Sequence, residues 1–310
     1  MANIQLNSLI VEDDTRRGIV SMLIGVFFFT LMSVCAKHLS NHNPVLQVVF
    51  FRCLFALVPS LIMVTAAGGI KTLRTERFGG HIFRALVGTA SMICLFYAFH
   101  LLPLADAVAI NFSGPLFVTL FAVLILKEPV GLHRWTALII GLVGVLIMVQ
   151  PGTNGATLIG GVVALSSAVF NGLAMTGVRS LGRTEPSTTT VFYFTLISTL
   201  LTLPTLPFVW QPPAWQDFLL LGFNGILAGL GQIFMTRAYQ HAPAAIVSPF
   251  NYSAVLWATA FGYVVWGDVP GRNIFFGAVI VIAAGIYIVY RETVVLRRKA
   301  EIPDREPTEF

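Results

Sequence analysis

The sequence predicts an all-α membrane protein in which ten transmembrane helices form two inverted five-helix repeats. Composition is the first reason: 56% of the 310 residues are hydrophobic, only 11% are charged, and the mean hydropathy is +0.82. These values lie far outside the range of soluble domains. The second reason is that the chain divides into ten apolar segments, and the third is a polar pattern that recurs in the second half.

Each apolar segment is long enough to cross a bilayer as a helix, because roughly 20 residues span about 30 Å of hydrocarbon. Acidic residues are absent between Asp14 and Glu76 and again between Glu128 and Glu185, so each stretch holds several crossings. The segments are continuously apolar rather than alternating, which favours helices over a barrel. The expected spans are 18–36, 45–67, 80–101, 104–126, 132–150, 157–178, 187–209, 216–236, 243–266 and 272–290.

An even number of spans puts both termini on the same side of the membrane. Lys37 and Arg272 then fall on one face, Arg52 remains inside the second span, and the other 16 of the 19 Lys and Arg residues fall on the opposite face. The positive-inside rule therefore predicts that both termini are cytoplasmic. The residues assigned to the cytoplasmic face are Arg16, Arg17, Lys71, Arg74, Arg77, Arg84, Lys127, Arg134, Arg179, Arg183, Arg237, Arg291, Arg297, Arg298, Lys299 and Arg305.

The two ends are expected to be cytoplasmic tails. Residues 1–17 carry acids followed by two arginines, and no small-residue cleavage pattern follows the first apolar segment, so a removed signal peptide is not expected. Residues 291–310 have too few apolar groups to pack and are expected to be disordered, with their basic part at the anionic inner leaflet. The three cysteines lack CxxC spacing and are expected to be small buried side chains.

An internal repeat relates residues 18–150 to residues 155–290. One register aligns Lys37 with Arg179 and Pro44 with Pro186, and a second, slightly shifted register aligns Pro103 with Pro243, Asn111 with Asn251, Ser113 with Ser253 and Glu128 with Asp268. Matches at polar and Pro positions indicate duplication more strongly than apolar matches do. Each copy holds five spans, an odd number, so the second copy enters the membrane from the opposite face. Inverted repeats of this kind meet near the midplane around a substrate site and permit alternating access.

Two polar triplets mark the expected substrate site. They are Asn111, Phe112 and Ser113 in the fourth span and Asn251, Tyr252 and Ser253 in the ninth. Asn and Ser are unfavourable in hydrocarbon unless hydrogen-bonded, so we expect the triplets to face each other across a water-filled cavity. The alternative is interhelical hydrogen bonding, worth about 0.6 kcal/mol on average. Phe112, Tyr252 and Trp257 are candidates for stacking on a planar ligand.

Arg52 is the one charge well inside a span. Three interpretations stay open: it binds an anionic substrate group, it forms an ion pair with Asp106, or its side chain snorkels to the interface. Asp106 is also the acid nearest to membrane depth and hence the candidate proton site. Weaker candidates, for which interface hydrogen bonding is the leading interpretation, are His100, Asn171, Asn224 and Gln232.

Other function classes find less support. A membrane-embedded enzyme would need a nucleophile, base or metal constellation at one depth, whereas the six histidines are scattered over both faces. We therefore expect no catalytic residue, metal or cofactor. A channel would need a ring of charge or a carbonyl-rich filter, and neither pattern is visible.

Four motifs resemble those of a known superfamily, and the resemblance covers about residues 18–290. The motifs are PVLQVVFFR, LLPLADAVAINFSGPLFVTLFAVLILKE, GLVGVLIMVQPG and APAAIVSPFNYSAVLWATAFGYVVWGD. The chain resembles the drug/metabolite transporter superfamily with two EamA-type repeats, and within it the group that contains bacterial riboflavin and S-adenosylmethionine uptake carriers and metabolite exporters. The S-adenosylmethionine carriers have a basic residue where Asn251 stands, a departure from that subgroup.

The resemblance implies a ten-helix carrier in the bacterial inner membrane, with a cavity lined by both halves. We expect a secondary transporter for a small polar or heteroaromatic metabolite, with riboflavin as the first substrate to test. Export of amino acids or related metabolites, or carriage of S-adenosylmethionine, is the alternative. The expected partners are a small-molecule substrate and the lipid bilayer, not nucleic acid, and monomer and oligomer both stay open. Small multidrug-resistance relatives couple to protons through a first-helix Glu, which spans 18–36 and 157–178 lack.

Overall fold

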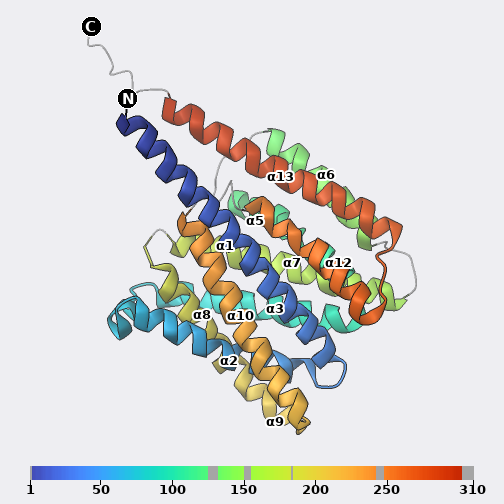
Figure 1. Ribbon diagram of the computed structural model, residues 1–310. Coiled ribbons are helices and arrows are strands. Elements are labelled where there is room, and N and C mark those ends of the chain that lie inside the picture. Colours follow the sequence, from blue (N-terminus) through green and yellow to red (C-terminus); the bar gives the residue numbers. More distant parts are fainter. Residues whose placement is uncertain (1, 125–131, 150–154, 183, 242–247, 302–310) are drawn as a thin grey trace.

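The computed structural model describes residues 2–124, 132–149, 155–182, 184–241 and 248–301 (Figure 1). Every regular element in these ranges is a helix. The α-helices are α1 (Ala2–Ser40), α2 (Val45–Ala66), α3 (Phe78–Leu101), α4 (Leu104–Asn111), α5 (Gly114–Leu124), α6 (Leu132–Val149), α7 (Gly155–Leu181), α8 (Ser187–Thr202), α9 (Leu206–Val209), α10 (Trp215–His241), α12 (Ser253–Trp266) and α13 (Arg272–Glu301). Short 3-10 turns are η1 (Gly69–Leu73), η2 (Leu203–Thr205) and η3 (Ser248–Tyr252).

Within the part of the chain that the structure describes, six helical segments are long and apolar enough to cross a membrane. They are Arg16–His42, Val45–Ala66, Phe78–Leu101, Leu158–Val178, Ser187–Val209 and Trp215–Ala238. Three shorter apolar helices accompany them, at Leu104–Val118, Trp135–Met148 and Arg272–Tyr287. The all-helical membrane class is therefore confirmed.

Helices from the two sequence halves interleave instead of forming separate bundles. The first helix of each half packs on the third helix of the other, as α1 does on α10 and α7 on α3. In the same way α2 packs on α10 and α8 on α3, while α6 packs along α13 at one side of the molecule (Figure 1). The main apolar core lies where these helices cross and includes Phe96, Phe99, Leu104, Ile110 and Leu116.

Glycines let the central helices approach closely. A Cβ at Gly25 of α1 would lie 3.2 Å from the carbonyl oxygen of Gly231 on α10, and one at Gly144 of α6 would lie 3.0 Å from that of Gly277 on α13. Such contacts allow backbones to pack directly, which is how membrane helices associate where lipid gives no hydrophobic driving force.

The expected spans 104–126 and 243–266 both depart from regular α-helix at their polar triplets, beside Pro115 and Pro249, the prolines that predict a bend in each span. The first breaks between α4, which ends at Asn111, and α5, which begins at Gly114. In the second, η3 ends at Tyr252 and α12 begins at Ser253. Helix interruptions at membrane depth are tolerated where side chains satisfy the freed backbone groups.

Both tails contain more helix than expected. Helix α1 begins at Ala2 rather than near residue 18, and α13 continues to Glu301, beyond the point where disorder was expected. Neither extension contains Pro or Gly, and Pro303 follows the end of α13. The extensions therefore lack the residues that break helices. The rest of the tail, 302–310, lies outside the described residues.

Candidate functional site

The serines of the two triplets make the same local contact. Ser113 Oγ donates a hydrogen bond of 2.7 Å to the carbonyl oxygen of Ile110, and Ser253 Oγ donates one of 2.7 Å to that of Phe250. Each hydroxyl thus satisfies a carbonyl of the preceding turn, where the helix is interrupted. Ser113 is also completely buried. These hydroxyls, expected to line a cavity, are engaged with their own backbone.

The aromatic members bring the two triplets together. The ring centroids of Phe112 and Tyr252 lie 5.3 Å apart with an interplanar angle of 47°. Both side chains are half-buried. The phenol of Tyr252 extends over Gly285 of α13, where an added Cβ would clash with the hydroxyl. Residues from equivalent places in the two halves therefore meet between them.

Asn111 bonds across a helix interface. Its Nδ2 donates to Ser167 Oγ of α7 at 2.8 Å, and Ser167 Oγ donates in turn to the carbonyl oxygen of Ser91 on α3 at 2.8 Å. Ser91 Oγ donates back to the carbonyl oxygen of Ser167 at 2.9 Å. This geometry matches the interhelical alternative considered for Asn111. Asn251, at the equivalent position, is half-buried.

Trp257 lies apart from the Phe112 and Tyr252 pair. Its side chain is 40% exposed, and its ring packs against Phe27 of α1 at 5.3 Å and against Phe261 at 6.4 Å between centroids. The structure therefore groups Trp257 with an aromatic cluster on α1 and α12, not with the triplets.

A charged cluster joins the end of α1 to the turn after α12. Lys37 Nζ donates to Asp268 Oδ2 at 2.8 Å and lies 4.7 Å from the ring centroid of Trp266. Asp106 is close enough to interact electrostatically with Lys37 and Asp268, and its buried Oδ1 has no hydrogen-bond partner. Lys37 was expected just beyond the first span on the external face, and only 10% of its side chain is exposed.

The possible ion pair between Arg52 and Asp106 is not formed. Both residues are described, and the structure instead places Asp106 with Lys37 and Asp268. The Arg52 side chain is half-buried in α2, and its Nε is buried without a hydrogen-bond partner. The guanidinium within electrostatic range of it belongs to Arg84.

Arg84 is the polar residue that sequence reasoning missed. It was assigned to the cytoplasmic face because it lies close to the expected start of its span. The structure places it inside α3, only 8% exposed, with its guanidinium 4.0 Å from the ring centroid of Phe194 on α8. One signal could have revealed it: the register that aligns Pro103 with Pro243 also aligns Arg84 with Asn224.

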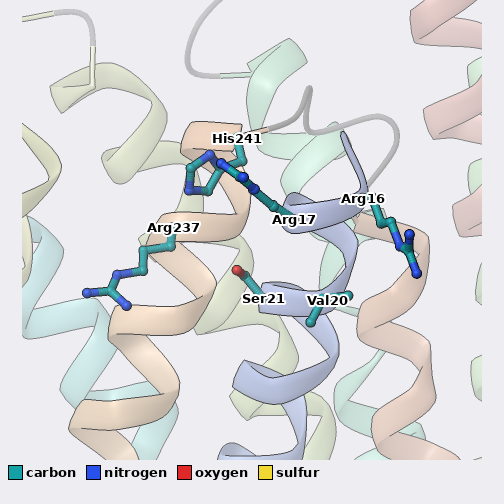
Figure 2. Close-up of a pocket in the computed structure, with 6 residues that line it drawn as sticks. All are labelled: Arg16, Arg17, Val20, Ser21, Arg237 and His241. Atoms are coloured by element: carbon teal, nitrogen blue, oxygen red, sulfur yellow. The ribbon is translucent and has the colours of Figure 1, made fainter. Parts of the chain in front are cut away.

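A basic groove of about 490 Å³ opens between residues 16–21 of α1 and the end of α10. Figure 2 shows the residues that line it, which are Arg16, Arg17, Val20, Ser21, Arg237 and His241. Arg17 and His241 lie side by side there, whereas the side chains of Arg16 and Arg237 point outward on either side. None of the candidate substrate residues lines this groove. Among the described residues, no three His, Cys, Asp or Glu side chains cluster as a metal site would require.

Interleaved halves, apolar helices and interrupted spans that meet at their polar triplets define a two-repeat helical membrane protein. The chain belongs to the EamA-like transporter family, whose model matches residues 16–150 and 158–291. These two matches correspond to the two expected repeats and confirm the family resemblance. The family consists of transporters rather than enzymes.

Similar proteins of known name are bacterial transporters. The chain is 29% identical over 280 residues to the pseudopaline exporter CntI of Pseudomonas aeruginosa, covering 89% of this chain and 97% of that protein. It is 28% identical over 286 residues to the S-adenosylmethionine uptake transporter of Rickettsia felis, covering 90% and 96%. It is 28% identical over 300 residues to the riboflavin transporter of Vibrio cholerae, covering 94% and 99%.

A solved crystal structure supports the fold. It aligns with 92% of this chain and 99% of its own, with a TM-score of 0.61 at 17% sequence identity. At that identity the likeness concerns the fold alone. The named relatives differ in substrate and in direction of transport, so they identify a transporter without identifying its cargo.

Proposed function

We propose that the protein is a secondary transporter that moves a small polar or heteroaromatic metabolite across the bacterial inner membrane. Its two five-helix repeats are inverted relative to each other and supply ten spans. The site that the two repeats share opens alternately to the two sides of the membrane. The observation that carries this proposal is a set of reciprocal polar contacts, in which equivalent residues of the two halves bind equivalent segments of the opposite half.

The first reciprocal contact involves the second helix of each half. Gln47 Nε2 donates to the carbonyl oxygen of Gln211 at 2.8 Å, and the backbone N–H of Gln211 donates to Gln47 Oε1 at 3.0 Å. Thr189 occupies the position equivalent to Gln47 in the register that aligns Pro44 with Pro186. Its Oγ1 donates to the carbonyl oxygen of Thr72 at 2.6 Å. In the expected topology the first contact lies on the external face and the second on the cytoplasmic face.

The second reciprocal contact involves the turn before each second helix. Asn43 Nδ2 donates to Asp217 Oδ2 at 3.0 Å. Glu185, which aligns with Asn43 in the same register, accepts from Thr75 Oγ1 through Oε1 at 2.7 Å. Again one contact belongs to each expected face. A two-fold relation between halves that enter the membrane from opposite sides accounts for both contact pairs, and such a relation permits rocking motions around a central site.

We call the ion pair of Lys37 with Asp268 a latch, meaning a contact that holds one side of the transporter closed. It holds α1 against the end of α12 on the expected external face. The repeat aligns Lys37 with Arg179 and Asp268 with Glu128, both on the expected cytoplasmic face. Glu128 and the side chain of Arg179 lie outside the described residues. Alternating access then consists of breaking one latch while its counterpart forms, with Asp106 beside the external latch as the candidate proton site.

The triplet region is the proposed substrate contact. Phe112 and Tyr252 offer adjoining aromatic faces, and Asn111 and Asn251 offer amide groups at equivalent positions, while Ser113 and Ser253 stabilise the helix interruptions. An aromatic pair suits a planar ring system, so riboflavin is the first substrate to test. Amino acids, related metabolites and S-adenosylmethionine are the alternative cargo.

Transport into proteoliposomes tests the proposal. Labelled riboflavin, S-adenosylmethionine and amino acids are offered to the wild type, Asn111→Ala and Asn251→Ala, with and without a pH gradient. We expect saturable transport of one compound and an increased KM in both variants, with circular dichroism and thermal midpoints reporting retained fold. Arg272→Gln, an exposed change on the expected external face, is the matched control. Wild-type KM values in both Asn variants would place the substrate elsewhere, and the absence of transport for all the compounds would count against the carrier.

A further inference from the structure

The groove between residues 16–21 of α1 and the end of α10 is lined mainly by basic side chains (Figure 2). Its lining consists of Arg16, Arg17, Arg237 and His241, together with Val20 and Ser21. No acid is among these six described residues. The groove's volume of about 490 Å³ falls in the range of roughly 300–1,000 Å³ that small-ligand sites occupy. The groove is therefore large enough for a ligand, and its charge favours an anion.

Two arginines flank the groove from the two helices. Figure 2 shows Arg16 and Arg237 on opposite sides of it. Both side chains are exposed, and neither forms an ion pair in the described part of the chain. Arg237 contacts the ring of Phe234, with its guanidinium 5.8 Å from the ring centroid. Arg17 and His241 are engaged in further contacts, so Arg16 and Arg237 are the guanidinium groups that remain available to an anion from outside the protein.

The groove has a packed base, because α1 and α10 touch backbone to backbone beside it. A Cβ at Gly25 would lie 3.0 Å from the backbone nitrogen of Met235 and 3.2 Å from the carbonyl oxygen of Gly231. Met22 and Ala238 each follow a lining residue in the sequence, and both are completely buried in an apolar cluster. The two helices are thus held together where the groove ends, which keeps its basic walls in place.

The groove lies at the boundary of the membrane. The membrane-crossing segment of α1 begins at Arg16, and that of α10 ends at Ala238. Val20 is 48% exposed, and Leu23, one turn farther into the span, is 37% exposed. An apolar surface therefore continues from the groove toward the hydrocarbon. In the expected topology this end of both helices faces the cytoplasm, where the leaflet carries anionic lipids.

We propose that this groove binds the phosphate group of an anionic phospholipid of the cytoplasmic leaflet. Arg16 and Arg237 turn toward the phosphate and donate N–H groups to its oxygens, an interaction that suits the guanidinium geometry. An acyl chain follows Val20 and Leu23 into the membrane. Basic pockets between membrane helices on the cytoplasmic side are typical sites for such headgroups. A soluble phosphate ester offers the same anion but makes no use of the apolar surface, which is why the lipid is favoured.

Thermal unfolding of the purified full-length protein in a neutral detergent tests the site. The probes are dioleoyl-phosphatidylglycerol, dioleoyl-phosphatidylcholine and glycerol 3-phosphate at constant ionic strength. A headgroup that bridges α1 and α10 stabilises the fold, so we expect phosphatidylglycerol to raise the thermal midpoint with about tenfold higher apparent affinity than phosphatidylcholine, which has no net charge. Equal affinities of the two lipids overturn the proposal. A stabilisation by glycerol 3-phosphate that matches phosphatidylglycerol also overturns it, because the site then takes a soluble anion.

A pair of double variants separates the groove from the general basic charge of this face. Arg16→Gln with Arg237→Gln should bring the preference for phosphatidylglycerol down to about twofold or less. Lys71→Gln with Arg74→Gln removes the same charge from exposed positions on the same expected face and should preserve the preference. Equal losses in the two double variants would show that the lipid responds to diffuse charge, which overturns the site.

Filling the groove provides a test that leaves every charge in place. Val20→Trp puts an indole into the groove and should abolish the preference for phosphatidylglycerol. Val58→Trp on α2 is the matched control, because Val58 is 51% exposed and Val20 48% exposed. Circular dichroism and the midpoint without lipid report the fold of each variant. An unchanged preference in the Val20→Trp protein places the lipid elsewhere. None of these measurements requires a transported substrate, so they test the lipid site independently of the carrier function.

Discussion

Lys37 of α1 donates to Asp268 beyond the end of α12 at 2.8 Å, which joins two residues that lie far apart in the sequence. The Lys37 side chain is 10% exposed and the Asp268 side chain 26% exposed, so water screens this pair only partly. The pair connects the first helix of one repeat to the ninth expected span in the other. Its position makes it a candidate for a contact that opens and closes during transport.

Reversing the charge at Lys37 should open this latch. Lys37→Glu places an acid against Asp268 and near Asp106, so we expect transport to fall at least tenfold. The loss of a hydrogen bond between charged groups should lower the unfolding free energy by about 1.5 to 3 kcal/mol. The double variant Lys37→Glu with Asp268→Lys should regain much of the transport rate. If the double variant regains no transport although the single and double variants both fold normally, the orientation of the pair or another role of these residues determines the transport rate.

The repeat predicts a second latch between Glu128 and Arg179. Because these residues align with Asp268 and Lys37, Arg179→Glu should impair transport and the further change Glu128→Arg should restore it. Proteoliposomes with wild-type and variant proteins provide the measurement. Ser180→Ala is the control, because it changes the neighbouring residue and leaves the charge of Arg179 in place. If the reversed pair transports no better than Arg179→Glu alone, the predicted pairing is wrong.

The triplet serines should act on stability more than on substrate affinity. Ser113→Ala and Ser253→Ala each remove one hydrogen bond to a carbonyl, so we expect a loss of about 0.5 to 1.5 kcal/mol in the free energy of unfolding. Ser113→Ala should show the larger loss because Ser113 is completely buried. Denaturation and transport kinetics measure both quantities. A tenfold rise in KM with unchanged stability would instead place the hydroxyl against the substrate.

Asn111 and Ser167 should be energetically coupled. Their 2.8 Å hydrogen bond links α4 to α7, and bonds of this kind in membrane proteins contribute about 0.6 kcal/mol on average. A double-mutant cycle with Asn111→Ala and Ser167→Ala should therefore give a coupling of this order. Additive effects of the two changes would show that the Asn111 amide does not stabilise the protein through Ser167.

Gly285 should be needed for the position of Tyr252. An added Cβ would clash with the phenol, so Gly285→Ala should displace the ring from Phe112 and reduce transport. Tyr252→Phe removes the hydroxyl and should restore part of the activity in the Gly285→Ala background. Gly271→Ala, at a position with open space around the added Cβ, is the control. Equal activities of the Gly285→Ala and Gly271→Ala proteins would contradict this packing role.

Local sequence properties were sufficient for the class of the protein and its duplicated organisation. Hydropathy adds up over neighbouring residues, so membrane helices are visible without knowing their partners. The triplets were recognised as special from their recurrence in the second half, and the prolines beside them, Pro115 and Pro249, predicted a bend in both spans. The actual ends of α1 and α13 also differed from expectation, because a helix continues beyond the apolar segment when no Pro or Gly stops it.

Only the tertiary structure decided which polar groups meet. Asp106 lies with Lys37 and Asp268 rather than with Arg52, the triplet serines turn back onto their own backbone, and Arg84 is buried inside α3. The partner of a side chain depends on the rotation, depth and crossing of helices that are distant in the sequence. Hydropathy carries none of that information, because it is insensitive to which face of one helix packs against another.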